Sequence, residues 1–450
     1  LHHLLLSEAD RPLIMTSGNL TDEPICRGND EAVARLKGIA DYFLLHDRDI
    51  HARCDDSVVM VVDARCVPLR RSRGYVPQPI KLGLTLEAEI LGCGADLKNT
   101  FCLARGDTAF PGQYIGDLQS YRNTQFWREG LEHMKSLLSF EPEIVAYDLH
   151  PGYISTEMAR SLDSPQKIAV QHHHAHIASC MAEAHLEEAI GVSFDGTGYG
   201  TDGTVWGGEF LLCTFHGFER LAHLEHVSMP GGETAIRQPW RMALSHLHRA
   251  YGDAVMELGL PFTKDLDEGK MLKVLSLAKG GFSSPVTSSM GRLFDAVASI
   301  LEIRHEVTYE GQAAIELQMM AHEGEDGVYP FLLTDGSPPW RIRTEPIIRS
   351  VVADLQDGFS RERIAARFHN TVASIISHTL SQIIEERGPK KVVLSGGVFQ
   401  NSLLLSASRR ALKRLKLEVY HPREVPPNDQ GISLGQVMVA GAIGGVIRCA

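Results

Sequence analysis

Four histidines stand within five positions in the stretch Gln171–Ser179, which reads Q-H-H-H-A-H-I-A-S. If a helix begins there, His172 and His176 lie one turn apart on the same face, close enough to share a metal ion. The spacing lacks the glutamate of the H-E-x-x-H motif, which disfavours a zinc protease. A polar helix start with hydrogen-bonded histidines is the alternative interpretation. The pattern favours a metal site whose other ligands lie elsewhere in the chain.

Two aspartates are candidates for those other ligands, because a metal held by two histidines normally has carboxylate ligands as well. Asp195 directly follows an expected strand at 189–193, and Asp429 lies in a Pro-Asn-Asp-Gln-Gly loop before the final expected helix. Each has the alternative role of an aspartate that stabilises a turn or caps a helix. Cys180 continues the histidine face by one more turn, but a lone cysteine there is typical of a buried apolar position.

Glycine-rich turns indicate where a nucleotide could bind, because backbone N–H groups must approach phosphate oxygens closely. Residues 91–98 and 194–200 are two such turns, each followed by a strand-like segment. This weak internal repeat would suit two related lobes that face a cleft, although ordinary tight hairpins give the same pattern. Residues 394–401 join a buried strand to a helix start, which favours an anion. Gly291 and Asp295 lie one turn apart, a spacing that suits binding of the ribose hydroxyls. The alternative is a glycine at a helix N-terminus followed by a solvated acid.

Composition sets limits on the class of protein. The 450 residues predict two or three domains, and 44% apolar with 22% charged residues exclude a disordered or fibrous chain. A net charge of −12 argues against a large sequence-independent nucleic-acid surface. The apolar run 437–447 is too short for a membrane span and predicts a buried helix. Eight cysteines without a C-x-x-C pair disfavour a disulfide framework and a zinc knuckle.

The predicted elements give a mixed α/β fold. Residues 1–75 have sparse α/β character, and prolines 77 and 79 favour a domain boundary near 80. Beyond residue 87, strands and helices alternate. The expected strands are 143–149, 167–171 and 390–394, and the expected helices are 29–39, 361–386 and 400–415. Because the chain begins at Leu1 without a secretory signal, we expect a fragment of a longer cytoplasmic protein.

Several motifs in a fixed order resemble the HypF carbamoyltransferase family, whose members are maturation factors of nickel-iron hydrogenases. The motifs are Thr16–Leu20, His46–Ile50, Arg70–Tyr75, Gly94–Thr100, Ile115–Leu118, Tyr147–Pro151 and Gln171–His176. The resemblance covers nearly the whole chain. It implies the C-terminal half of a YrdC-like α/β domain at 1–80. A TsaD-like domain with a duplicated actin-like, two-lobed architecture is implied at 87–450.

The resemblance also implies the site residues, position by position. The metal ligands of that group correspond to His172, His176, Asp195 and Asp429, a set that would accept Fe(II), Zn(II) or Mn(II), with iron or zinc expected. The ATP or adenylate site corresponds to Gly196, Thr197, Gly198, Gly291, Asp295, Gly396, Gly397 and Asn401, with Lys98 as a further phosphate candidate. In the partial YrdC-like domain, the residues expected to line one side of a pocket are Thr16, Ser17, Asn19, Arg71 and Arg73.

The implied chemistry is ATP-dependent carbamoyl transfer. The family converts carbamoyl phosphate and ATP, through carbamate, into carbamoyl-adenylate and then into a carbamoyl thioester on the C-terminal cysteine of HypE. Dehydration of that thioester supplies the cyanide ligands of the hydrogenase. Carbamoyl-adenylate is an activated anhydride, so its transfer needs mainly positioning and stabilisation of charge. The resemblance implies a HypE-like partner, with no nucleic-acid or membrane partner.

Departures from the family pattern limit what the 450 residues are expected to do. Full-length members begin with an acylphosphatase domain, cysteine-rich zinc fingers and the first half of the YrdC-like domain, and these are absent here. Gly18 stands where free-standing YrdC proteins have alanine. We therefore expect this chain to transfer the carbamoyl group from carbamoyl-adenylate but not to form carbamoyl-adenylate. The alternatives are a nucleotide-gated actin-like scaffold without covalent chemistry and a kinase of the sugar-kinase type, which would leave the histidines without a role.

Overall fold

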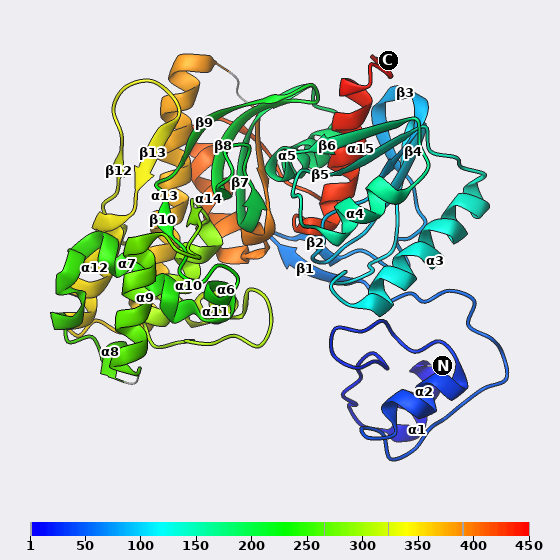
Figure 1. The fold of residues 1–450 in the computed structure, drawn as a ribbon, viewed down its shortest axis with the longest axis horizontal. Coiled ribbons are helices and arrows are strands. Elements are labelled where there is room, and N and C mark those ends of the chain that lie inside the picture. The colour runs from blue at the N-terminus through cyan, green and yellow to red at the C-terminus, as the bar shows by residue number, and fades with distance from the viewer. Residues whose placement is uncertain (1, 265, 323, 389–390, 450) are drawn as a thin grey trace.

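The computed structural model describes residues 2–264, 266–322, 324–388 and 391–449, most of which form two α/β lobes (Figure 1). The first lobe contains a five-stranded sheet. Its strand β3 (Ile80–Gly92) pairs antiparallel with β4 (Cys102–Pro111) and parallel with β5 (Ile144–Asp148). β5 in turn pairs parallel with β6 (Gln166–Val170). The strand β16 (Ile447–Cys449), from the end of the chain, pairs antiparallel with the first half of β3.

The second lobe repeats this arrangement within a nine-stranded sheet. Here β7 (Glu188–Tyr199) pairs antiparallel with β8 (Val205–Thr214) and parallel with β14 (Lys391–Ser395), which pairs parallel with β15 (Glu418–Tyr420). The spatial order β4-β3-β5-β6 therefore recurs as β8-β7-β14-β15, with the same strand directions. The predicted duplicated two-lobed α/β fold is confirmed. The remaining strands of this sheet are β9 (Phe218–Leu224), β10 (Val227–Ser228), β11 (Val286–Thr287), β12 (Leu332–Leu333) and β13 (Trp340–Arg343).

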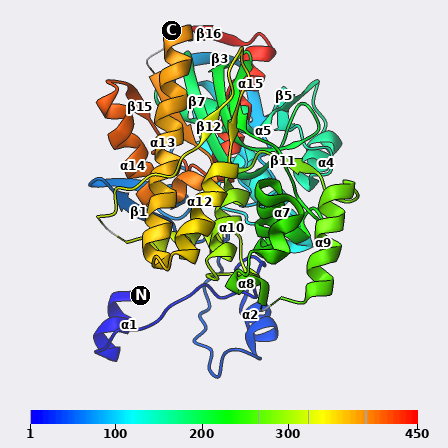
Figure 2. The same cartoon turned by 90° about the vertical axis from the view of Figure 1, so that its left-hand side faces the viewer.

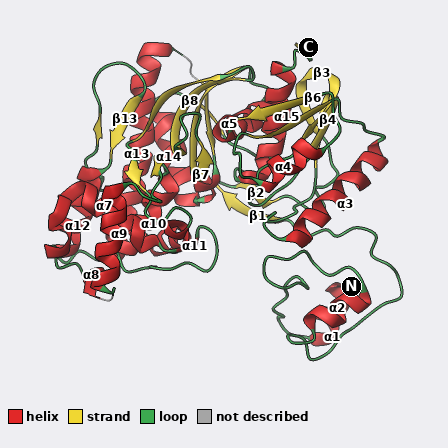
Figure 3. Ribbon diagram, in the orientation of Figure 1, coloured by secondary structure: helices red, strands yellow, loops and turns green. Residues whose placement is uncertain are grey.

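Two helices lie between the sheets, α5 (His172–Glu183) and α15 (Ile432–Ile443) (Figure 3). α5 follows a strand of the first lobe but packs mainly on β7, β8 and β14 of the second. α15 follows a strand of the second lobe and packs on β3, β4 and β5 of the first. Each helix thus covers the sheet of the other lobe. The helices touch at Gly435, where a Cβ atom would lie 1.9 Å from the Ala175 carbonyl oxygen, so glycine is required.

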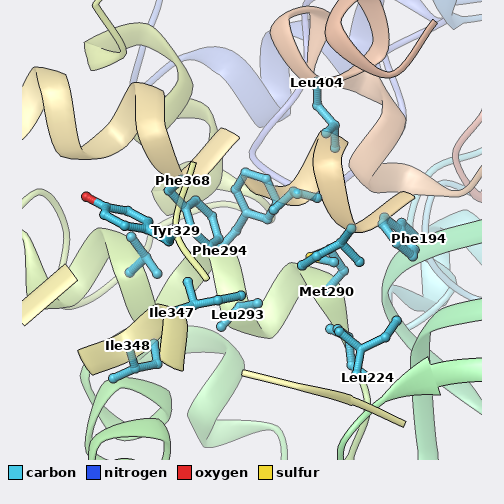
Figure 4. Packing of buried hydrophobic residues seen from close by; sticks show 14 of the residues in the cluster. Phe194, Leu224, Met290, Leu293, Phe294, Tyr329, Ile347, Ile348, Phe368 and Leu404 are labelled. Carbon is cyan, nitrogen blue, oxygen red and sulfur yellow. The ribbon is translucent and has the colours of Figure 1, made fainter. Parts of the chain in front are cut away.

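Further helices cover the outer faces of both sheets. On the first lobe these are α3 (Tyr121–Leu138) and α4 (Ile154–Ser161). On the second lobe α10 (Met290–Ile300) and α13 (Arg361–Arg387) enclose the largest core, whose aromatic and aliphatic side chains interlock as Figure 4 shows. The other helices of this lobe are α6 (Thr234–Arg237), α7 (Pro239–Tyr251), α8 (Pro261–Lys264), α9 (Glu268–Gly280), α11 (Gln312–Met320), α12 (Glu345–Gln356) and α14 (Ser402–Arg414).

The N-terminal segment packs poorly by comparison. Neither α1 (His2–Ala9) nor α2 (Asn29–Leu36) has a buried residue, and both lie at the edge of the molecule (Figures 1 and 2). The hairpin of β1 (Val58–Val62) and β2 (Arg65–Arg70) behaves differently, because Val62 and Val67 join the core of the second lobe. Residues 58–70 are therefore held by the lobes and not by the segment that precedes them.

Most of the elements expected from the sequence lie where the patterns place them. Residues 361–386 belong to α13 and residues 402–414 to α14, whereas residue 390 of the expected strand 390–394 lies outside the described residues. The prediction of a helix over 437–447 is wrong at its C-terminal end. α15 stops at Ile443 because Gly445 has a φ of +70°, and Ile447 already belongs to β16. Within the described ranges, no helix is long and apolar enough to cross a membrane.

Candidate metal and nucleotide site

The histidine-rich stretch forms the first turn of α5, directly after β6. Gln171 caps the helix, since its side-chain oxygen accepts a hydrogen bond from the His174 N–H at 2.8 Å. The cap fixes the point at which the helix begins, and therefore the face on which His172 and His176 stand. Both side chains are buried, with exposed fractions of 0% and 1%. The local sequence thus presents two imidazoles side by side in the interior.

Asp195 and Asp429 approach this pair from the second lobe. Asp195 lies in β7, and Asp429 begins a short 3-10 helix (Asp429–Gly431) that leads into α15. One ligand atom from each of the four residues lies within 4.8 Å of all the others. The His172 Nε2 atom is 3.3 Å from Asp195 Oδ2 and 3.7 Å from Asp429 Oδ1. The His176 Nε2 atom is 3.5 and 3.6 Å from the same two oxygens.

These residues fit a metal ion by an independent criterion. Both ring nitrogens of His176 are buried without a hydrogen-bond partner, a costly state unless another group satisfies one of them. Ligand bonds of about 2.1 Å in a tetrahedron place neighbouring ligand atoms roughly 3.4 Å apart, close to the separations found here. Nitrogen and carboxylate donors suit a borderline divalent ion such as iron or zinc. That the four residues bind a metal stays a prediction.

Electrostatics also favours a cation at this position. Burial alone would lower the pKa of His172, but Asp148 and Asp429 outweigh it and raise that pKa well above its ordinary value. Burial would likewise raise the pKa of Asp195, yet His172 and His176 hold it well below the usual range. The pKa of Asp429 is lowered as well, so both aspartates are ionised at neutral pH. The negative charge of the aspartates attracts a positive charge to this position, which can be a proton on an imidazole or a metal ion.

Asp148 also contacts the candidate metal site, although the sequence analysis did not predict it. It ends β5, and its Oδ2 atom accepts a hydrogen bond from His172 Nδ1 at 2.7 Å. The bond leaves Nε2 of His172 directed at the two aspartates, as outer carboxylates do for metal-binding histidines. The available signal was an aspartate near the end of the expected strand 143–149, within the motif Tyr147–Pro151. Pairing Asp148 with His172 requires knowing that β5 and β6 are neighbours.

The loop leading to Asp429 is anchored to the other end of α5. The Glu183 carboxylate accepts hydrogen bonds from the backbone N–H groups of Arg423, Glu424 and Val425 at 2.8 to 3.1 Å. α5 therefore carries the histidines at its start and fixes the Asp429 loop at its end.

Changing Gly435 should test whether the contact between α5 and α15 keeps the ligands together. In Gly435→Ala the new Cβ overlaps the Ala175 carbonyl, so the helices must separate. We expect a melting temperature lower by several degrees and at least about tenfold weaker metal binding. Thermal unfolding and competition with a chelator measure the two effects. Gly280→Ala is the matched control, because a Cβ there has nothing within 4 Å, and equal behaviour of the two variants would contradict the prediction.

The predicted nucleotide glycines gather around Asp195. A Cβ on Gly291 would lie 2.9 Å from the Gly196 Cα, and one on Gly397 would lie 2.9 Å from Asp195 Oδ1. The Gly397 N–H donates a hydrogen bond to that oxygen at 3.0 Å. Gly396 has a φ of +102°, a conformation that favours glycine. Three chain segments thus meet at one edge of the candidate metal site.

The segment 194–200 was predicted as a turn after a strand, but Gly196, Thr197 and Gly198 lie within β7, where its pairing with β8 is irregular between Phe194 and Gly198. This irregular stretch, called the Gly196 turn below, lies against the histidines. A Cβ on Gly198 would lie 2.4 Å from His173 Cε1, so any larger residue would press on the imidazoles. Thr197, between the two glycines, is half-buried.

Three predicted nucleotide residues already have partners. Asp295 is buried and forms an ion pair with Arg292 at 2.7 Å. Asn401 caps α14 by accepting a hydrogen bond from the Leu404 N–H at 3.0 Å. Lys98, at the turn after β3, forms an ion pair with Glu310 of the second lobe. Their roles in nucleotide binding stay predictions, and the cap means that substituting Asn401 would also destabilise α14.

Of the five residues expected to line one side of a YrdC-like pocket, a role that stays a prediction, the least exposed is Arg71. Its side chain is 3% exposed and donates hydrogen bonds to the carbonyls of Pro111 and Gln78. The reason is that the β1–β2 hairpin packs on the two lobes and carries Arg71 inward. Arg73 remains exposed near Asp56. Thr16 and Ser17 are exposed, and Asn19 donates hydrogen bonds to backbone carbonyls in its own loop.

Comparison with known proteins gives the class and then the family. A model described as the second subdomain of the carbamoyltransferase Kae1-like domain matches residues 191–436. The model of the HypF Kae1-like domain matches residues 85–183, and a Sua5/YciO/YrdC model described as telomere recombination matches residues 1–72. The two lobes thus define a Kae1-like protein. The chain belongs to the HypF carbamoyltransferase family.

Individual relatives agree with this assignment. Carbamoyltransferase HypF of Synechocystis sp. is 39% identical over 454 residues, which cover 97% of this chain and 58% of that protein. A HypF homolog of Cupriavidus necator is 35% identical over 370 residues, covering 78% of this chain and 91% of the homolog. The chain therefore spans less than two thirds of a long relative such as the Synechocystis protein.

Solved structures show the same fold. A crystal structure of full-length HypF in a phosphate- and nucleotide-bound form superposes with a TM-score of 0.94 at 45% identity, covering 98% of this chain and 69% of that one. HypF of T. kodakarensis gives a TM-score of 0.88 at 36% identity, covering 96% and 57% of the two chains.

Proposed function

We propose that this chain transfers a carbamoyl group from carbamoyl-adenylate to the C-terminal cysteine of a HypE-like partner during hydrogenase maturation. The observation that carries the proposal is the convergence of His172, His176, Asp195 and Asp429 beside the glycine turns at Gly196 and Gly397. A site for a divalent cation directly next to a site for a nucleotide phosphate suits transfer from an adenylate, because the cation can stabilise the negative charge that grows as AMP leaves. The membership of the HypF family and the nucleotide bound to a HypF relative support the same interpretation.

The transfer step involves one bond formed and one bond broken. The partner's thiolate sulfur attacks the carbamoyl carbon, the bond from that carbon to the phosphate oxygen breaks, and AMP leaves with the electron pair. A bound Fe(II) or Zn(II) ion would act as a Lewis acid that stabilises negative charge. The residues of this chain hold the adenylate by its phosphate. They also exclude water from the metal side of the site, because His172 and Asp195 lie in the interior. The nucleophile comes from the partner, so no cysteine of this chain need react.

A transfer assay tests the proposal. The metal-loaded chain is mixed with carbamoyl-adenylate and a HypE-like partner, and mass spectrometry locates the carbamoyl group on the partner. We expect a thioester at the terminal cysteine and none on a partner in which that cysteine is alanine. Nucleotide binding without any transfer would instead favour the nucleotide-gated scaffold.

A further inference from the structure

Arg292 lies at the start of α10, next to the glycine turn at Gly196. The preceding Ser289 caps the helix, and its hydroxyl lies 2.8 Å from the Asp195 carbonyl oxygen and 2.6 Å from that of Gly196. α10 is also anchored in the core of the second lobe by Leu293 and Phe294 (Figure 4). The helix start is therefore held rigidly against the turn.

The guanidinium of Arg292 is buried but poorly satisfied. Arg292 is 5% exposed, and its Nη2 atom would lie 3.8 Å from a Cβ on Gly196. The acceptor provided by the described residues is Asp295, whose Oδ2 atom is 2.7 Å from Nη2. The Nε atom is buried without a hydrogen-bond partner. Since a guanidinium has five N–H donors and buried donors are costly when unpaired, an acceptor is missing at this position.

The missing acceptor should be an anion with several oxygens. A planar guanidinium forms paired hydrogen bonds with phosphate more readily than with a single carbonyl oxygen. The open space beside the Gly196 turn is where a phosphate can approach, since Gly196 has no side chain to block it. Gly196 directly follows Asp195 in β7, so a phosphate bound beside Gly196 would adjoin the candidate metal ion.

We propose that Arg292 binds the phosphate of the adenine nucleotide at the Gly196 turn, while Asp295 holds the guanidinium in position. This inference rests on the proposed function and deepens it, because it assigns the group that recognises the leaving AMP. As the bond to AMP breaks, negative charge grows on that phosphate, and a fixed guanidinium stabilises it without reorganisation. Arg292 then contributes both to nucleotide affinity and to selection of a nucleotide over its nucleoside.

Calorimetric titration of the metal-loaded chain with AMP and with adenosine tests the inference. In Arg292→Gln we expect AMP to bind at least about tenfold more weakly, because the variant loses a hydrogen bond between charged groups. Adenosine should bind as it does to the parent chain. Arg292→Lys, which keeps a cation, should show an intermediate loss for AMP. The matched control is Arg304→Gln, because Arg304 pairs with Glu316 and is 39% exposed.

Folding of the variants needs its own control, because Arg292→Gln leaves Asp295 buried without its cation. The double variant Arg292→Gln with Asp295→Asn removes both charges together, and its melting temperature reports the fold. We expect the same selective loss of AMP binding in it. An equal loss for AMP and adenosine in the variants, or no loss of AMP binding in Arg292→Gln, would overturn the role of Arg292 while leaving the proposed function intact. A parent chain that binds neither ligand would overturn both.

Discussion

Replacing His176 with alanine should leave the purified chain without its metal while the fold persists. The His176 Nε2 atom lies 3.5 and 3.6 Å from the two aspartates, and neither ring nitrogen has a hydrogen-bond partner to lose. Loss of one of four ligands should weaken binding at least about a hundredfold and abolish carbamoyl transfer. Elemental analysis measures the bound metal, and circular dichroism measures the fold.

His174 provides the matched control for this experiment. It stands on the same helical turn, but its Nε2 atom faces the Thr214 carbonyl oxygen at 2.7 Å and lies away from the four ligand atoms. His174→Gln should therefore retain the metal. Full metal occupancy in His176→Ala, or equal loss in both variants, would show that the imidazole pair is only a structural feature of α5.

The second large effect concerns carbamoyl-adenylate formation, which we expect the 450-residue chain alone not to perform. Its YrdC-like residues lack a core, because α1 and α2 bury nothing and Ile14, Tyr42 and Leu44 are 105%, 93% and 82% exposed. A pocket with such a surface cannot hold carbamoyl phosphate and ATP in a reactive geometry. Transfer from supplied carbamoyl-adenylate should proceed nonetheless.

Release of AMP and pyrophosphate, with carbamoyl phosphate and ATP as substrates, measures this difference. The comparison is between this chain and a version extended at its N-terminus by the corresponding residues of a longer family member. We expect release by the extended version alone. Equal rates would place adenylate formation within the two lobes and contradict our assignment.

Local rules explain which parts of the site could be predicted from the sequence. The pairing of His172 with His176 follows from helical spacing. The glycine-rich segment at 194–200 marked an irregular stretch, but β7 continues through it to Tyr199 instead of ending before it. The sequence also indicated the duplication, since the two turns lie in equivalent β hairpins, β3–β4 and β7–β8. Asp429 was a candidate from its loop before the final expected helix, and the family resemblance then assigned it to the histidine site, because spacing alone does not bring a distant loop to α5.

The features that were missed depend on contacts between distant elements. Asp148 reaches His172 only because β5 and β6 are adjacent. Arg71 is buried because the β1–β2 hairpin packs on the lobes. Arg292 faces Gly196 because Ser289 fixes the start of α10 to the turn. None of these relations is encoded in a local pattern, so each required the arrangement of the whole molecule.

The exchange of α5 and α15 between the lobes has a consequence for how the protein forms on the ribosome. The sheet of the first lobe is synthesised more than 250 residues before α15, which covers its inner face, and before the strand β16, which pairs with β3. That face must remain without its cover until α15 has emerged. Nascent chains stalled before residue 432 should therefore be captured by chaperones that bind exposed apolar strands, and the metal site can close only after Asp429 has left the ribosome.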